Sequence, residues 1–252
     1  MNKIPVNNIC GVAIIYSKDD PSRIFLETKT SDYPVKVFAG SLCLIGGNWI
    51  GEAAKADANP METLRRELDE ELCLAPLTEG QHEELSLLGL GQGTKYDLQK
   101  NTQASEADIQ CLNEVKKAMS LSIVPFLDAV SLTPKRVFDG ADPQNKRGDI
   151  QALLSNYLIP LERETWNELV RLQKRYGNLS NESLSVILTF DEIREKGLKV
   201  SWGHDRALDR FCRMYSDDKG IPLVEGVVWE NHGAPMSSYD KYEEIYDVAK
   251  RP

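Results

Sequence analysis

The chain has 252 residues, of which 41% are hydrophobic and 27% are charged. This composition supplies enough apolar side chains for one sizeable core and does not favour intrinsic disorder. The net charge of −9 and the pI of about 5.0 argue against a general nucleic-acid binder, because contacting many phosphates requires a surface rich in Lys and Arg. A small anionic ligand stays compatible with this charge if a metal ion supplies local positive charge.

Cysteine usage and the N-terminal residues favour a cytoplasmic protein. The five cysteines are dispersed and form no C-x-x-C pair: Cys10, Cys43, Cys73, Cys111 and Cys212. This pattern favours neither a disulfide framework nor a zinc knuckle, and it fits a reducing cytosol. The only early apolar run is ended by Asp19, Asp20 and Pro21. We therefore expect no signal peptide and no transmembrane span.

The first predicted elements are a hairpin and a capped helix. Residues 9–16 and 23–27 are strands joined by a turn at 18–22, and a stretch rich in β-formers at 35–45 runs into two glycines. A helix is predicted over 59–74, because Asn59 is a good N-cap, Pro60 suits the first helical position and Glu62 stands where a capping-box acid belongs.

The rest of the chain alternates irregularly between strands and helices. Strands are predicted at 85–90, 121–132, 150–161 and 183–190, and helices at 105–119, 164–176, 191–196 and 205–215. Polar loops cover 91–102 and 133–148, and the tail is core-like only at 221–229. This order indicates an α/β or α+β layered domain with a mixed sheet.

Three glutamates of the predicted 59–74 helix share one face. Glu67, Glu70 and Glu71 are spaced i, i+3 and i+4. At about 100° per residue they are centred roughly 110° from an apolar stripe of three leucines. The stripe comprises Leu64, Leu68 and Leu72. The acids therefore flank the buried stripe, as in a helix that packs on a sheet and lines a cleft.

Carboxylates this close repel one another, and one tends to bind a proton unless a cation is present. Mg²⁺ or Mn²⁺ removes the repulsion, because these ions prefer oxygen ligands. Arg66 precedes Glu70 by four residues and can hold it by an ion pair. The alternative is a solvated acidic face, which is the commoner meaning of an acidic helix considered alone.

The surrounding residues add a motif to this helix. The stretch reads Gly46-Gly47 … Gly51-Glu52 … Arg66-Glu67-Leu68-Asp69-Glu70-Glu71-Leu72-Cys73-Leu74. It resembles the signature of the Nudix hydrolases, a glycine, a glutamate and then R-E-(apolar)-x-E-E-x-G-(apolar). A later phrase, Leu188-Thr189-Phe190-Asp191-Glu192-Ile193, is similar to a strand and short helix late in many family members. The box covers about 46–74, and the resemblance of the fold extends over about 9–215.

Two features depart from the family pattern. Cys73 stands where the family has a glycine, which favours a left-handed exit from a helix, so Cys73 implies a different exit. The interval from Glu52 to Arg66 is also longer than in the family, as if residues 53–58 were inserted. The opening glycine-to-glutamate spacing fits if Gly46 is the family glycine.

The resemblance implies a Nudix-type α/β/α sandwich around a mixed β-sheet over residues 1–215. It would carry an inserted helical segment at about 91–147 and a C-terminal extension, 216–252, packed on the domain. The implied activity is that of a metal-dependent pyrophosphohydrolase, which cleaves the pyrophosphate linkage of a nucleoside diphosphate linked to another group.

The resemblance also assigns site residues. Glu67, Glu70 and Glu71 would bind Mg²⁺ or Mn²⁺, and Glu70, Glu71 and Arg66 would be catalytic. Gly46, Gly47 and Glu52 would bind substrate. The general base is either a box glutamate or a later acid, and the candidates flank the 150–161 strand: Asp149, Glu162 and Glu164.

Other interpretations stay open at this point. The altered spacing and Cys73 motivate a catalytically weak or inactive Nudix-like domain that binds a nucleotide or a protein partner. An interaction protein with a solvated acidic helix is a third possibility. Trp202-Gly203-His204-Asp205 is interpreted as a helix start, with a substrate contact by Trp202 or His204 as the less favoured alternative. The expected partner is a small anionic nucleotide-type substrate, not a nucleic-acid polymer or a membrane, and a homodimer is left open.

Overall fold

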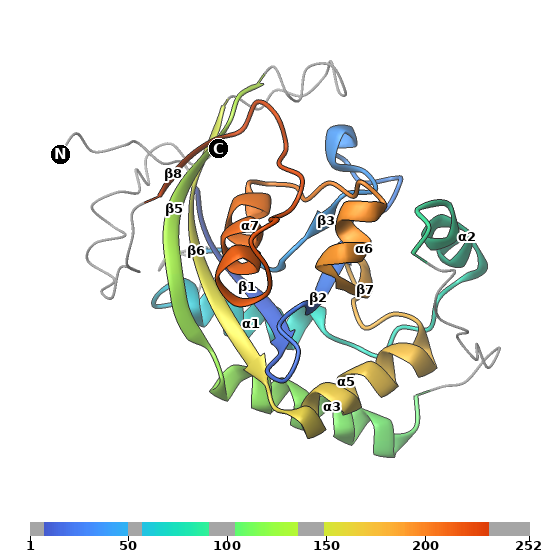
Figure 1. Cartoon of the computed structure of the whole chain (residues 1–252). Coiled ribbons are helices and arrows are strands. Elements are labelled where there is room, and N and C mark those ends of the chain that lie inside the picture. Colours follow the sequence, from blue (N-terminus) through green and yellow to red (C-terminus); the bar gives the residue numbers. More distant parts are fainter. Residues whose placement is uncertain (1–7, 50–56, 91–103, 136–148, 232–252) are drawn as a thin grey trace.

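The structure, a computed structural model, describes residues 8–49, 57–90, 104–135 and 149–231 (Figure 1). The strands in these ranges are β1 (Asn8–Ser17), β2 (Arg23–Thr28), β3 (Leu42–Cys43), β4 (Ile45–Asn48), β5 (Val124–Thr133), β6 (Ile150–Leu161), β7 (Leu184–Thr189) and β8 (Val228–Asn231). The helices are α1 (Pro60–Glu71), α2 (Glu79–Leu87), α3 (Glu106–Leu121), α5 (Arg163–Tyr176), α6 (Phe190–Glu195) and α7 (His204–Tyr215), with a 3₁₀ turn, η1, at Lys36–Phe38. None of these helices is long and apolar enough to cross a membrane.

One mixed eight-stranded sheet organises the molecule. Its order is β3-β2-β1-β6-β5-β8, with β4 also paired to β1 and β7 to β2. β1 and β6 run parallel from the Asn8–Ala152 pair to the Ser17–Leu161 pair, and the remaining strand pairs are antiparallel. The expected α/β class with a mixed sheet is therefore confirmed.

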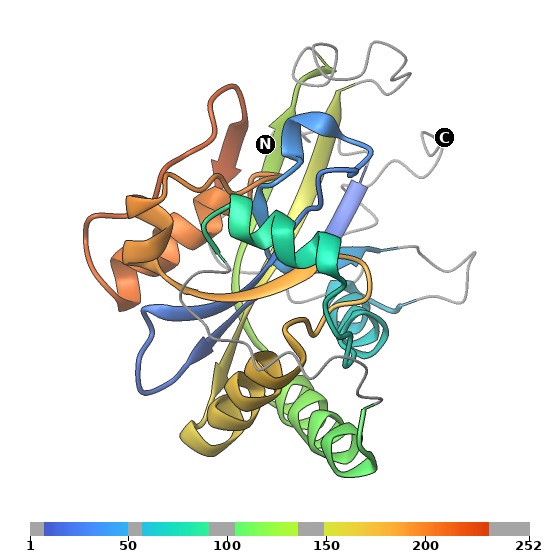
Figure 2. The same ribbon diagram turned by 90° about the vertical axis from the view of Figure 1, so that its right-hand side faces the viewer.

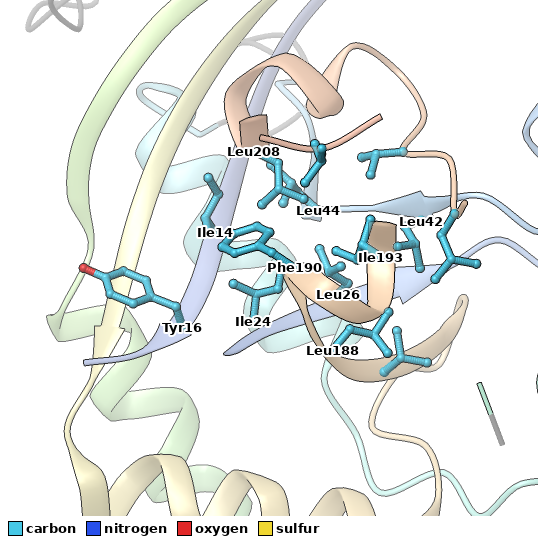
Figure 3. Packing of buried hydrophobic residues seen from close by; sticks show 14 of the residues in the cluster. Ile14, Tyr16, Ile24, Leu26, Leu42, Leu44, Leu188, Phe190, Ile193 and Leu208 are labelled. Carbon is cyan, nitrogen blue, oxygen red and sulfur yellow. The ribbon is translucent and has the colours of Figure 1, made fainter. Parts of the chain in front are cut away.

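Helices cover both faces of the sheet, and a hydrophobic core lies on each side (Figure 1, Figure 2). Side chains alternate along β1, so Ala13 and Ile15 belong to the core under α1, α3 and α5, whereas Val12 and Ile14 belong to the core under α6 and α7. Figure 3 shows the second core, where Phe190 and Ile193 of α6 and Leu208 of α7 meet the strands. These apolar contacts fix the helices against the sheet.

α3 and α5 are joined by a buried acid. Asp108 of α3 is 4% exposed and forms ion pairs with Arg171 and Arg175 of α5, at 2.8 and 3.0 Å. It also accepts a 2.8 Å hydrogen bond from the Tyr176 hydroxyl. Hydrogen bonds from Arg171, Ser105 and Tyr176 outweigh the effect of burial and lower the pKa of Asp108 to about 2. The N-terminus of α3 is thus anchored on α5.

Most of the elements predicted from the sequence are confirmed. β1 and β2 form the expected hairpin, with Ile15 opposite Phe25. Asn59 caps α1 by accepting from the amides of Met61 and Glu62. Ser105 caps α3, β6 covers 150–161, and α5 ends at Gly177 with a φ of 77°.

Two stretches differ from the expectation. The predicted strand at 85–90 is wrong, because a capping box between Thr78 and Gln81 begins the helix α2 and Leu85 is its buried residue. The β-rich stretch at 35–45 holds a 3₁₀ turn and the short strand β3 before β4 begins. Its apolar side chains Val35 and Phe38 pack with Tyr33 and Trp202 instead of forming a continuous strand.

The predicted insertion and tail both contribute to the sheet. Within the predicted 91–147 insertion, the described part forms α3 and β5, and β5 pairs with β6 from Val124 to Thr133. After residue 215 the chain returns to the sheet as β8, which pairs with β5. The division into a domain and an extension at residue 215 stays a prediction.

Candidate active site

The helix α1 packs closely on the strand β1. Its apolar residues Leu64 and Leu68 are buried in the core shared with α3 and α5. A Cβ on Gly11 of β1 would collide with the carbonyl of Pro60, so glycine at this position allows the first turn of the helix to reach the strand. This contact places the acidic edge of α1 beside β4.

A cavity of about 540 Å³ opens along this edge. It is lined by residues of β1, β4, β5 and β6, by the acids of α1, and by the segment that begins α7. Six of the residues that the sequence analysis assigns to metal, catalysis or substrate binding line it: Gly46, Gly47, Arg66, Glu67, Glu70 and Glu71. Glu52, the seventh, lies outside the described residues.

The two glycines of β4 allow the strand and the acids to come together. Gly46 has a φ of 132°, and a Cβ there would collide with the Gly11 carbonyl of β1. A Cβ on Gly47 would collide with the carboxylate of Glu67. A side chain at position 47 would therefore displace the glutamate from the cavity edge.

Arg66 connects three acids at the cavity rim. Its guanidinium lies 2.9 Å from Glu67 Oε1, 2.7 Å from Glu70 Oε2 and 3.2 Å from Asp57 Oδ2. Asp57 is 9% exposed, and the sequence analysis did not single it out. Arg66 orients Glu67 and Glu70 and leaves the second oxygen of each carboxylate available to another ligand.

Glu71 is the most buried acid of the helix. It is 4% exposed, and its Oε2 has no hydrogen-bond partner in the described part of the chain. Burial, together with the charges of Glu27 and Glu67, raises the pKa of Glu71 to about 9. A carboxyl group in this position requires a proton or a cation.

Glu27, near the end of β2, and Lys29, which follows this strand, complete the cluster. The sequence analysis missed both residues. Glu27 is buried, and its Oε1 accepts a 2.6 Å hydrogen bond from the Ser180 hydroxyl. The ammonium of Lys29 lies 3.9 Å from Glu27 Oε2 and donates to the Ser183 hydroxyl at 3.0 Å. Lys29 and Glu182 both line the cavity. Their local sequence gave no signal, because the cluster forms only when β2 and the 178–183 segment meet.

The same segment holds the C-terminus of α1. Leu72 leaves the helix in an extended conformation (φ −75°, ψ 119°), and the Cys73 amide donates to the Leu179 carbonyl at 3.1 Å. The backbone and side-chain nitrogens of Asn181 donate to the carbonyls of Glu71 and Glu70. The different helix exit expected from Cys73 is therefore confirmed.

Uncharged side chains also line the cavity. His204, the first residue of α7, is 6% exposed, and its Nδ1 accepts a 3.2 Å hydrogen bond from the Leu44 amide. Burial, with a smaller effect of Lys29, lowers the pKa of His204 to about 3, so the imidazole is neutral. Burial raises the pKa of Cys10 and Cys43 to about 12, which keeps both thiols protonated and poor nucleophiles.

The general-base candidates beside β6 are not brought to the cavity. The lining residues of β6, Ala152 and Leu154, belong to the beginning of the strand, whereas Glu162 and Glu164 follow its end. Glu162 forms an exposed 2.6 Å ion pair with Lys18. Asp149 accepts from the Lys135 amide at 2.7 Å and does not line the cavity. Glu182 is the acid from a later segment that does line it.

The cavity thus offers carboxylate oxygens, an ammonium and neutral side chains. In the described residues, no three His, Cys, Asp or Glu side chains form a group that could hold a metal ion as they stand. No known family model matches the chain, and no curated protein matches it significantly.

Proposed function

We propose that this protein is a metal-dependent hydrolase of the Nudix type, which cleaves the pyrophosphate linkage of a nucleoside diphosphate joined to another group. The observation that carries the proposal is Glu71, a buried carboxylate with an unpartnered oxygen beside Glu67 and Glu27. Helices on both faces of a mixed sheet support the same assignment, because this is the layering that the family resemblance implies.

The acids supply the oxygen ligands that a hard divalent cation prefers, but their side chains would have to reorient to hold one, since in the described residues they form no metal-binding group as they stand. Glu67, Glu70 and Glu71 supply carboxylate oxygens, the ligands that Mg²⁺ and Mn²⁺ prefer. The oxygens that Arg66 does not contact, and Oε2 of Glu71, are the ones that would hold the ion. When bound, such an ion offsets the charge of a diphosphate and lowers the pKa of a coordinated water.

The protein residues have separate roles in this proposal. Arg66 holds Glu67 and Glu70 at the cavity rim, and Gly47 leaves room for the Glu67 carboxylate. Lys29 supplies a fixed positive charge beside the acids, which favours an anionic substrate. Glu182, which lines the cavity, would accept a proton from the attacking water.

Glu70→Gln and Glu71→Gln test the proposal. In an assay of nucleoside triphosphates, dinucleotides and nucleotide sugars with Mg²⁺ or Mn²⁺, each substitution is expected to lower turnover at least about a hundredfold, because a metal ligand is lost. Glu162→Gln is the matched control, since Glu162 forms an exposed pair away from the cavity. Unchanged turnover in both site variants would refute their roles.

A nucleotide-binding domain without turnover is the second candidate. The ion pairs of Arg66 favour it, because they partly neutralise Glu67 and Glu70 without a metal ion. A binder would be stabilised by a nucleotide in a thermal-unfolding assay with no metal present and would release no product. A hydrolase would require the metal for both results.

A further inference from the structure

The guanidinium of Arg66 is shared between the α1 acids and a second set of acceptors. Of the acids that line the cavity, Glu70 Oε2 lies 2.7 Å from Nη1 and Glu67 Oε1 lies 2.9 Å from Nη2. Nε donates to both oxygens of Asp57, at 3.3 and 3.2 Å, and Nη2 lies 3.2 Å from Asp57 Oδ2. Nη2 also donates to the Asn48 carbonyl at 3.4 Å. Nε and Nη2 thus form the fork by which a guanidinium binds a carboxylate.

Asp57 holds Arg66 from outside the cavity. Arg66 and the helix acids line the cavity, whereas Asp57 does not. The Asp57 carbonyl accepts a 2.7 Å hydrogen bond from Nε1 of Trp49, a buried residue whose amide donates to the Ile9 carbonyl of β1. Asp57 also precedes α1, so a rotation of the glutamate side chains of that helix leaves it in place. It belongs to the stretch 53–58, which makes the interval before Arg66 longer than in the Nudix signature.

A divalent cation in the cavity requires Glu67 and Glu70 to reorient. As they stand, each directs one oxygen to Arg66, and in the described residues the acids form no metal-binding group. Turning towards an ion weakens both pairs with the guanidinium. Because the Arg66 side chain is only 27% exposed, the loss of acceptors is costly, and its charge repels the ion. Cation binding therefore depends on what else holds Arg66.

We propose that Asp57 is a positioning residue, which keeps the Arg66 guanidinium paired and in place while Glu67 and Glu70 reorient to a divalent cation. The three carboxylates are balanced in charge by Arg66 and one such ion together. The inference rests on the proposed function for the presence of the cation, but not for turnover. The alternative role for Asp57 is a purely structural pair that fastens residue 57 to α1.

Binding of Mn²⁺ alone to the full chain, followed by electron paramagnetic resonance of the free ion, tests the inference. Asp57→Asn retains the size of the side chain but removes its charge, and it is expected to weaken Mn²⁺ binding about ten- to a hundredfold. Asp57→Glu restores the charge and is expected to recover most of the affinity. Glu62→Gln is the matched control, because Glu62 forms an exposed 2.7 Å pair with Arg65 on the same helix. Its affinity for Mn²⁺ is expected to equal that of wild type.

Thermal unfolding separates a positioning role from a structural one. Without Mn²⁺, Arg66 retains its two glutamate partners in Asp57→Asn, so the unfolding temperature is expected to stay near that of wild type. The upward shift that Mn²⁺ produces is expected to shrink, because the ion binds the folded variant more weakly. A structural pair predicts the reverse, a lower unfolding temperature without Mn²⁺ and an unchanged shift, and that result would overturn the inference.

A double substitution tests whether Asp57 acts through Arg66. In an Arg66→Met background, Asp57→Asn is expected to change the affinity for Mn²⁺ less than about twofold, because the group that it positions is absent. A loss as large as in the wild-type background would contradict the role.

The outcomes distinguish this inference from the proposed function. If wild type turns over a substrate with Mn²⁺ and Asp57→Asn binds Mn²⁺ as tightly, the inference fails and the hydrolase stands. The expected losses of affinity in a chain that hydrolyses no substrate would refute the hydrolase and keep the role of Asp57. A wild-type chain that binds no Mn²⁺ at millimolar concentration would refute both.

Discussion

Lys29 explains how several acids share one end of the cavity. Its side chain is 16% exposed, lies 3.9 Å from the 2% exposed Glu27 and interacts electrostatically with the buried Glu71. Burial alone would lower the pKa of this lysine, but Cys43 and the neighbouring acids raise it. The ammonium therefore stays charged and offsets acids that would otherwise repel one another.

Removing Lys29 is expected to destabilise the protein. Lys29→Met leaves the Glu27 carboxylate buried without its cation, and we expect a loss of about 2–4 kcal/mol in the free energy of unfolding, measured with urea. Adding Glu27→Gln is expected to recover part of the loss. Lys18→Met serves as the matched control, because its pair with Glu162 is exposed. Equal losses for Lys29→Met and Lys18→Met would contradict this account.

At the level of elements, α1 ends without a left-handed glycine. The Nudix signature that this stretch resembles has a glycine at position 73, but this helix ends in extended backbone at Leu72. Residues 72 and 180 then form a β-bridge, and Asn181 caps the last carbonyls of the helix. The helix C-terminus is therefore fixed by the 178–181 segment, without a left-handed residue.

Two opposite glycine substitutions test this exit. Cys73→Gly is expected to destabilise by about 0.5–1 kcal/mol, because the extended backbone gains nothing from glycine and the unfolded chain gains entropy. Gly177→Ala is expected to cost more than about 1 kcal/mol, since Gly177 has a φ of 77° and a Cβ there would lie 2.7 Å from Leu77 Cδ1. Thermal unfolding measures both. If Cys73→Gly raised the unfolding temperature, a left-handed glycine after α1 would be the more stable helix end in this protein.

Elements with strong local signals were predictable from the sequence. The Asn59-Pro60 start of α1, the Gly177 end of α5 and the apolar run of β6 each depend on residues next to one another. The strand predicted at 85–90 is wrong because a short run with several leucines fits either a strand or a helix. The Thr78 cap upstream decides for the helix.

The site was predictable only where it is local. The α1 acids follow from helical spacing, and the glycines of β4 precede them in one motif. Glu27 and Ser180, by contrast, are 153 positions apart, and His204 meets Leu44 across 160 positions. Such contacts depend on strand order and packing, which periodicity does not encode.

At the scale of the whole molecule, the cavity depends on the completed sheet. Its lining comes from β1 and β4 near the N-terminus, from β5 and β6 in the middle, and from the start of α7. Residues 216–231 support that last part: the Val224 amide donates to Asp205 Oδ2 at 2.8 Å, and the Ile221 amide donates to Asp209 Oδ1 at 2.9 Å. β8 then covers the outer edge of β5.

These contacts predict that the sequence after residue 215 is required for the fold. A chain ending at Tyr215 loses β8 and the Val224 amide that donates to the fully buried Asp205. An unmet buried carboxylate costs about 1–3 kcal/mol, and an uncovered β5 edge favours association between molecules.

We therefore expect the chain ending at Tyr215 to unfold at a markedly lower urea concentration than a chain ending at Asn231. The longer chain keeps every contact just named. The shorter chain is also expected to elute as aggregates in size-exclusion chromatography. Asp205→Asn in the full chain separates the two causes. It alters the acceptor of the Val224 amide while leaving β8 in place, so it is expected to lower stability without aggregation. Equal stability of the two truncated chains would instead make 216–231 an independent extension. The start of α7 would then be held by the packing of Leu208 and Phe211 and by the bond between the Leu44 amide and His204.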